Sequence, residues 1–140
     1  MGTKTQSPVS YRSDERESVR VTSPSVIPVL DCTEGLRRSG GDEQLFRELT
    51  AVFLADVSRL TQLIHVALAE RSAEGLRQAA HSLRGSASQI GALAVTERAS
   101  ILEKMGKAAD LGDAPEQRLL LTEELRQLLL ALNAADLLSS

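Results

Sequence analysis

His81 is the residue of this sequence whose type and surroundings most clearly suggest chemistry. An imidazole can be neutral and nucleophilic near physiological pH, so an exposed histidine can accept and release a transferable group. Apolar residues around His81 recur with the helical period. At about 100° per residue, His81 lies about 140° from Leu76, on the polar side of that helix. The pattern therefore predicts a solvent-facing histidine in the middle of a helix.

Basic side chains and a glycine surround this histidine. Arg77 lies one turn before His81, Arg84 lies one turn after it, and Gly85 stands at position i+4. Glycine inside a helix costs about 1 kcal/mol relative to alanine, so its presence here needs a reason. A missing side chain one turn away leaves room for a bulky group to approach the imidazole. The arginines could donate hydrogen bonds to a phosphate-like group on the ring.

An exposed histidine on a helix is more often only a polar surface residue, and His65 illustrates that reading. Its predicted exposure is similar, but nothing nearby offers charge or clearance: its neighbours on the helix are Thr61, Gln62, Leu68 and Ala69. We therefore expect chemistry at His81 and none at His65.

Helix start and stop signals divide the chain around these residues. Gly40 and Gly41 followed by Asp42 predict a break and an N-cap, and apolar residues at helical spacing continue to about Glu70. Asp56 falls on the apolar stripe of this helix, where a buried carboxylate would be costly. We therefore expect either a bend at Asp56 or a bundle end open to water.

The remaining signals predict the other helices. Ser72 caps the helix that carries His81 and Gly91 ends it. A third long helix ends at Gly112-Asp113, Pro115 suits the first turn of a fourth, and a short helix is expected at residues 33–39. The fold class predicted is all-α, an antiparallel four-helix bundle with a short extra N-terminal helix.

Composition separates a tail from this bundle. Three of the four prolines fall in residues 1–28 together with many serines and threonines, which is typical of a disordered linker or tail. Residues 29–140 are expected to form the bundle, and they are long enough to bury one core.

Composition also excludes several classes of function. The net charge of −3 and the scarcity of aromatic residues argue against nucleic-acid binding. The single cysteine, Cys32, forms no internal disulfide or zinc site. We find no run of about 18 apolar residues and no secretory signal, so we expect a cytoplasmic protein without membrane contact.

The segment around His81 resembles the signature of histidine-containing phosphotransfer (HPt) domains of bacterial phosphorelays. The family pattern is a histidine, a small or polar residue, leucine, lysine, glycine, two small residues and then an apolar-glycine pair. Residues 81–92 read HSLRGSASQIGA. The resemblance extends from about Val29 to Asn133, and its flanking matches are Leu30-Asp31, Gly40-Gly41-Asp42, Phe53-Leu54 and Ala79-Ala80.

The resemblance implies a role for each matching residue. His81 corresponds to the phosphoryl acceptor and Gly85 to the glycine that opens space beside it. Arg84 stands where the family usually has lysine, so the charge is kept. Glu103 falls where many members carry a polar residue near the histidine, and Lys107 falls where some carry a second base. The alternative reading of Glu103 and Lys107 is an ordinary surface ion pair one turn apart.

The resemblance further implies a phosphocarrier without autonomous kinase activity. Its partners would be receiver domains of response regulators or of a hybrid sensor kinase, and the receiver would supply Mg²⁺, so no cofactor or metal is expected in this chain. We expect a monomer, either freestanding or cut from a hybrid kinase. The alternatives are a helical interaction scaffold without phosphoryl chemistry and the dimerising histidine domain of a true kinase, which would need a following ATPase domain.

Overall fold

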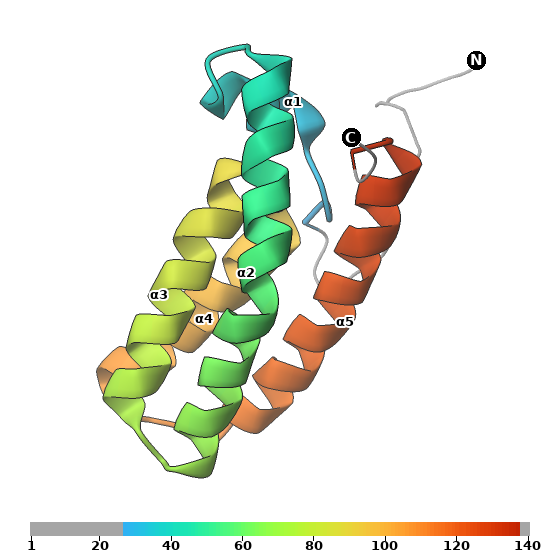
Figure 1. Cartoon of the computed structure of the whole chain (residues 1–140). Helices are drawn as coiled ribbons and strands as arrows, with labels where there is room; N and C mark the ends of the chain where they lie inside the picture. Colours follow the sequence, from blue (N-terminus) through green and yellow to red (C-terminus); the bar gives the residue numbers. More distant parts are fainter. Residues whose placement is uncertain (1–26, 138–140) are drawn as a thin grey trace, which may run out of the picture.

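The structure is a computed structural model that describes residues 27–137, and this range contains five helices and no strand (Figure 1). The predicted all-α class is thus confirmed. The tail predicted for residues 1–28 lies almost entirely outside the described residues. The helices are α1 (Cys32–Arg38), α2 (Glu43–Ala69), α3 (Ala73–Gln89), α4 (Leu93–Ala108) and α5 (Ala114–Ala134).

Side-chain caps fix where the first helices begin. The Asp42 carboxylate accepts a hydrogen bond from the backbone N–H of Leu45 at 3.1 Å, and the Ser72 hydroxyl accepts one from Gly75 at 3.0 Å. Each cap satisfies a backbone donor that has no partner within its helix. Both predicted N-caps are therefore confirmed, and they set the starts of α2 and α3.

The four long helices run up and down beside one another, with α4 behind α2 and α3 and with α1 across one end (Figure 1). The short connections between consecutive helices require this antiparallel order. The inner faces meet in one core, whose largest fully buried apolar side chains are Leu60, Ile64, Leu76, Leu83, Ile90, Leu102, Leu121, Leu128, Leu132, Val29 and Val95.

Two glycines allow close backbone approaches that shape the bundle. Gly91 has a φ of +75°, and a Cβ there would lie 2.2 Å from the carbonyl oxygen of Asp31. At Gly106 of α4, a Cβ would lie 2.7 Å from the backbone nitrogen of Arg77 and 2.8 Å from the carbonyl oxygen of Ala73. Gly106 therefore lets α4 pack directly against the backbone of α3.

The predicted end of the third long helix is wrong. α4 ends before Gly112, because Ala109 takes the left-handed conformation (φ 55°) and stops the helix there. α2 continues without interruption past Asp56, which lies mid-helix, so of the two alternatives expected there the bundle end is also wrong. The Asp56 carboxylate is half-exposed and binds Arg59 of the next turn, so it avoids the cost of burial.

α2 is the one helix among the described residues that is long and apolar enough to be compared with a membrane span. By length and composition it could cross a membrane, with a mean hydropathy of 1.4 over 18 residues. That test is weak evidence for a single helix, and 22% of the tested segment is buried inside the bundle. Every such window in α2 contains Asp56 and Arg59, and Phe53, Leu60 and Ile64 lie in the bundle core.

Candidate functional site

His81 lies in the middle of α3 with its side chain 59% exposed, as the helical pattern predicts. The opposite face of α3 holds the helix in place, because Leu76, Ala80 and Leu83 are completely buried. The imidazole is therefore exposed on a helix whose opposite face is packed in the core. α4 lies on one side of it and α2 on the other.

Glu103 of α4 fixes the orientation of the imidazole. Its carboxylate is almost fully buried, and its Oε2 lies 2.9 Å from His81 Nδ1. An ionised carboxylate can only accept, and two lone pairs at that separation would repel each other, so we assign the proton to Nδ1, which donates it to Glu103. Arg84 Nη2, 3.1 Å from Nδ1, is then a neighbouring positive charge and not a hydrogen-bond donor to the ring. The other ring nitrogen, Nε2, is then left with its lone pair exposed to solvent.

Arg84 binds the same carboxylate from one turn further along α3. Its Nε donates to Glu103 Oε1 at 2.6 Å, and its Nη2 lies 3.1 Å from His81 Nδ1. The hydrogen bond from Arg84 is the largest reason that the pKa of Glu103 lies below its ordinary value. The hydrogen bond from His81 lowers this pKa further. Glu103 is therefore ionised under the ring, and Arg84 balances its charge.

The other basic residues near His81 contribute unequally. Lys107 Nζ lies 3.9 Å from Glu103 Oε2, and its side chain is exposed beside the cluster. Arg77 turns away from the cluster, since its guanidinium binds both carboxylate oxygens of Glu74. The structure thus brings His81, Arg84, Glu103 and Lys107 together and leaves Arg77 paired elsewhere.

Gly85 is exposed, and a Cβ built on it would have no heavy atom within 4 Å. Nothing inside the bundle therefore requires a glycine at this position, in contrast to Gly106. No packing contact therefore offsets the helix-propensity cost of this glycine.

The resemblance predicts a polar residue near the histidine at Glu103, and the helical pattern predicts its pairing with Lys107; the structure shows both contacts. The sequence did not predict that this carboxylate is buried, or that its shortest contact is with Arg84. No role was predicted from the sequence for Gly106, three residues further along α4. A glycine inside an otherwise regular helical pattern was the available signal for this close helix approach.

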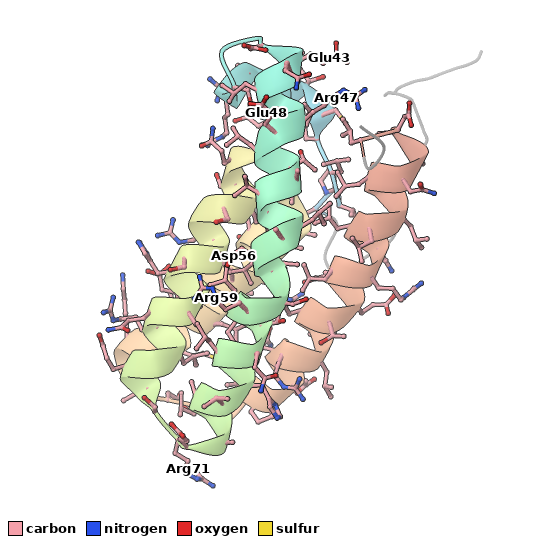
Figure 2. The ribbon with its side chains drawn as sticks, viewed as in Figure 1. Glu43, Arg47, Glu48, Asp56, Arg59 and Arg71 are labelled. Atoms are coloured by element: carbon pink, nitrogen blue, oxygen red, sulfur yellow. The ribbon has the colours of Figure 1, made fainter. Side chains whose placement is uncertain are left out.

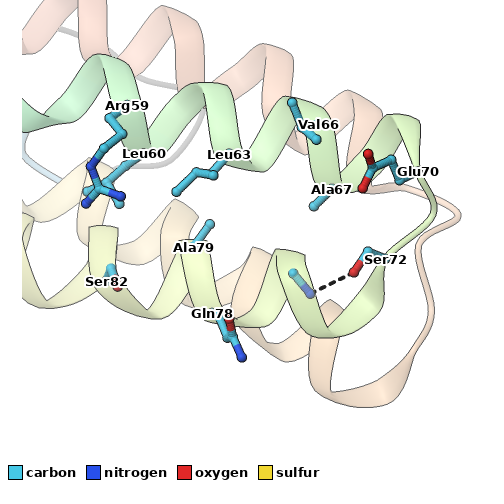
Figure 3. A pocket seen from close by; sticks show the side chains of 11 residues that line it. Arg59, Leu60, Leu63, Val66, Ala67, Glu70, Ser72, Gln78, Ala79 and Ser82 are labelled. Atoms are coloured by element: carbon cyan, nitrogen blue, oxygen red, sulfur yellow. Dashed lines mark hydrogen bonds between the residues drawn. The ribbon is translucent and has the colours of Figure 1, made fainter.

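Two grooves run between α2 and α3 on the side of His81 away from Glu103. One, of about 270 Å³, is lined by Leu49, Val52, Phe53, Asp56, Gly85, Ser86, Gln89 and Ile90, and we call it the Gly85 groove. The other, of about 370 Å³, includes Arg59, Leu63, Val66, Gln78 and Ser82 (Figure 3), and we call it the Ser82 groove. A partner that reaches His81 from this side would meet apolar α2 side chains.

Among residues 27–137, no group of three or more histidine, cysteine, aspartate or glutamate side chains is placed to hold a metal ion. The cluster at His81 consists of one histidine, one carboxylate and two bases. Such a cluster suits an anionic group that arrives at the ring, because Arg84 and Lys107 supply positive charge at its edge.

Comparison with known proteins agrees with this geometry. A family model described as the Hpt domain matches residues 48–135, more than half of the chain. The crystal structure of histidine-containing phosphotransfer protein B (HptB) from Pseudomonas aeruginosa PAO1 is similar in fold. Its TM-score is 0.71 at 24% sequence identity, and the match covers 77% of this chain and 94% of that one. No curated protein matches the sequence.

Proposed function

Since this chain belongs to the Hpt domain family and serves histidine phosphotransfer in phosphorelays, we propose that His81 is the residue that carries the phosphoryl group. The observation that supports this assignment most directly is the contact between Glu103 and Nδ1. It leaves Nε2 as the exposed nucleophilic atom of a half-exposed ring.

The chemistry follows from that tautomer. Nε2 attacks the phosphorus of an aspartyl phosphate in a receiver domain, so an N–P bond forms while the O–P bond breaks and the aspartate leaves as a carboxylate. The ring keeps its Nδ1 proton and gains positive charge, which the ionised Glu103 stabilises. No proton has to be transferred in this step. The reverse transfer to another aspartate uses the same contacts.

The remaining cluster residues act on the transferring group. Arg84 and Lys107 are positioned to attract phosphoryl oxygens, and Arg84 lies closer to the ring, with Nη2 3.1 Å from Nδ1. Gly85 leaves the approach to His81 open. These roles need positioning and charge rather than further covalent chemistry.

Hpt proteins are phosphocarriers that pass phosphoryl groups to and from receiver domains. For this chain we infer that the receiver supplies Mg²⁺ and that the chain itself needs no cofactor and has no kinase activity of its own. We further expect a cytoplasmic monomer that serves receivers of response regulators or of a hybrid sensor kinase.

The test is phosphotransfer from isolated receiver domains of the source organism, each loaded with acetyl phosphate. We expect at least one receiver to transfer its label to the wild-type chain. The label should be labile in acid and stable in base, as a phosphohistidine is. His81→Gln should accept no label, and His65→Gln serves as the matched control because His65 is the only other histidine.

Labelling of His81→Gln at the wild-type level would contradict the assignment. A wild-type chain that accepts no label from any receiver would instead favour the scaffold reading. Circular dichroism of each variant should show an unchanged helical signal, because both histidines are exposed and neither supports the core.

A further inference from the structure

Asp56 and Arg59 form a charged pair on an otherwise apolar exposed face of α2. Val52 lies one turn before Asp56 and Leu63 one turn after Arg59, and both are exposed. Figure 2 shows the pair midway along α2, on the side of α3. It contributes nothing to the bundle core or to the cluster at His81.

Two hydrogen bonds join the pair, and they leave other donors of Arg59 free. Arg59 donates through Nε to Asp56 Oδ1 at 2.8 Å and through Nη2 to Oδ2 at 3.0 Å. The side chains are 61% and 39% exposed. A guanidinium has five N–H groups, so three remain, and Nη1 has no hydrogen-bond partner among residues 27–137. Asp56 therefore fixes Arg59 in place while the outer edge of the guanidinium faces solvent.

The position of the pair relates it to His81. Asp56 lines the Gly85 groove and Arg59 lines the Ser82 groove, so the pair has one member at each groove. Ser82, in the Ser82 groove, follows His81 directly in sequence. Gly85, in the Gly85 groove, lies one turn after His81. In Figure 3, Arg59 extends from α2 toward α3 above Ser82. A domain that places an aspartate at His81 from the α2 side would therefore cover Arg59.

Covering Arg59 has an energetic consequence that depends on the partner. An N–H group that loses water without gaining an acceptor is costly, and an uncompensated charge is costlier. A carboxylate opposite the guanidinium would replace the lost water with a charge-assisted hydrogen bond. An apolar or basic group opposite the guanidinium would not replace the lost water. Arg59 therefore favours a partner with a carboxylate there and disfavours a partner without one.

We propose that the Asp56–Arg59 pair selects among receiver domains, favouring those whose docking surface is apolar and carries a carboxylate opposite the outer edge of Arg59. This inference rests on the proposed function, because it assumes that a receiver docks at His81. Arg59 acts on docking and not on the transfer of the phosphoryl group.

A matched control exists on α5. Glu123 and Arg126 form a pair with the same spacing, with the arginine 61% and the carboxylate 43% exposed. α5 contributes no residue to either groove. Arg126→Ala therefore removes an equivalent surface ion pair without touching the face beside His81.

The experiment measures single-turnover transfer from each phosphorylated receiver that loads wild-type His81, over a series of receiver concentrations. For Arg59→Ala we expect the half-saturating concentration to rise roughly tenfold with the preferred receiver, the effect of one charge-assisted hydrogen bond. The maximal rate should change less than about twofold, because the site at His81 is intact. Arg126→Ala should match wild type in both quantities.

A charge reversal sharpens the test. Arg59→Glu should weaken docking further, and a receiver in which the opposing acidic residue is replaced by lysine should restore it. The inference is overturned if Arg59→Ala behaves like Arg126→Ala, or if it lowers the maximal rate without changing half-saturation. If no receiver loads the wild-type chain, both the proposed function and this inference fail. If receivers load wild-type His81 and Arg59→Ala has the half-saturating concentration of wild type, this inference fails and the proposed function stands.

Discussion

At the scale of single residues, the chemistry depends on how one buried carboxylate is shared. Glu103 accepts from His81 through Oε2 and from Arg84 through Oε1. The first contact selects the tautomer of the imidazole, and the second keeps the carboxylate ionised. Arg84 thus supports Glu103, and in the proposed mechanism it also offers positive charge to an arriving phosphoryl group.

Arg84→Ala should therefore slow transfer from a phosphorylated receiver, or shorten the lifetime of the phosphohistidine, by about tenfold. Arg84→Lys should recover part of this loss, because a single ammonium restores the charge but cannot hold Glu103 as the guanidinium does. Single-turnover kinetics give the rates, and circular dichroism checks that the helices remain. A wild-type rate and lifetime in Arg84→Ala would reduce Arg84 to a solvated surface charge.

Glu103 should also link stability to pH. Because its pKa in the folded protein lies below the ordinary value of 4.5, the ionised form is favoured by folding. Its contribution is fully present above pH 4.5 and is lost as the pH falls through the lowered pKa. Urea unfolding between pH 3 and about pH 6 should show a weaker pH dependence in Glu103→Gln than in wild type. Parallel curves for the two proteins would contradict the ion pair with Arg84.

At the scale of helices, the cluster exists because α4 lies unusually close to α3. The absent side chain of Gly106 brings α4 against Ala73 and Arg77, and Glu103, about one turn earlier in α4, then reaches His81. The helix register and the chemistry are therefore set by the same packing contact.

Gly106→Ala should force the two helices apart, destabilise the protein by about 1–3 kcal/mol and slow transfer. Gly85→Ala is the matched control, since a Cβ there meets nothing and should stabilise the helix by up to about 1 kcal/mol. Denaturant unfolding of both variants checks the contrast. Equal stability of the two variants would show that Gly106 has no role in helix approach.

A buried ion pair holds α5 against α4. Arg98 donates to Glu124 through Nε at 3.0 Å and through Nη2 at 2.8 Å, and its Nη1 donates to Gln117 at 2.6 Å. Both charged side chains are buried, so removing one leaves the other uncompensated.

Glu124→Ala should therefore lower the free energy of unfolding by about 3–5 kcal/mol, whereas the double replacement Arg98→Met with Glu124→Leu should come near wild type. Chemical denaturation measures both. Transfer to His81 should be unaffected in the double variant, because the pair lies on another helix interface. A double variant as unstable as Glu124→Ala would show that Arg98 and Glu124 are not coupled.

At the scale of the whole molecule, the sequence was sufficient for what depends on local pattern. The caps at Asp42 and Ser72 and the apolar periodicity predict the helices, and the same periodicity predicts the exposure of His81. These features depend only on neighbouring residues. The burial of Glu103 could not be predicted in the same way, because it depends on the register of α4 against α3.

Asp56 is a second residue whose surroundings could not be predicted from the local sequence pattern. The period of α2 correctly places it among apolar residues, but a rule based on burial then predicts a bend or a bundle end open to water. The face in question is exposed, and Arg59 on the next turn binds the carboxylate. A residue that contradicts the apolar pattern therefore indicates a surface of interest rather than a defect of the helix.

The measurement that tests the account most directly is NMR of the phosphorylated, ¹⁵N-labelled chain. We expect one phosphoramidate signal, with ³¹P coupled to Nε2 of His81, while Nδ1 keeps its proton and its contact with Glu103. In Glu103→Ala, which removes the acceptor for Nδ1–H, this selectivity should weaken. Phosphorylation at Nδ1 of His81 or at any other residue of the wild-type chain would contradict the account.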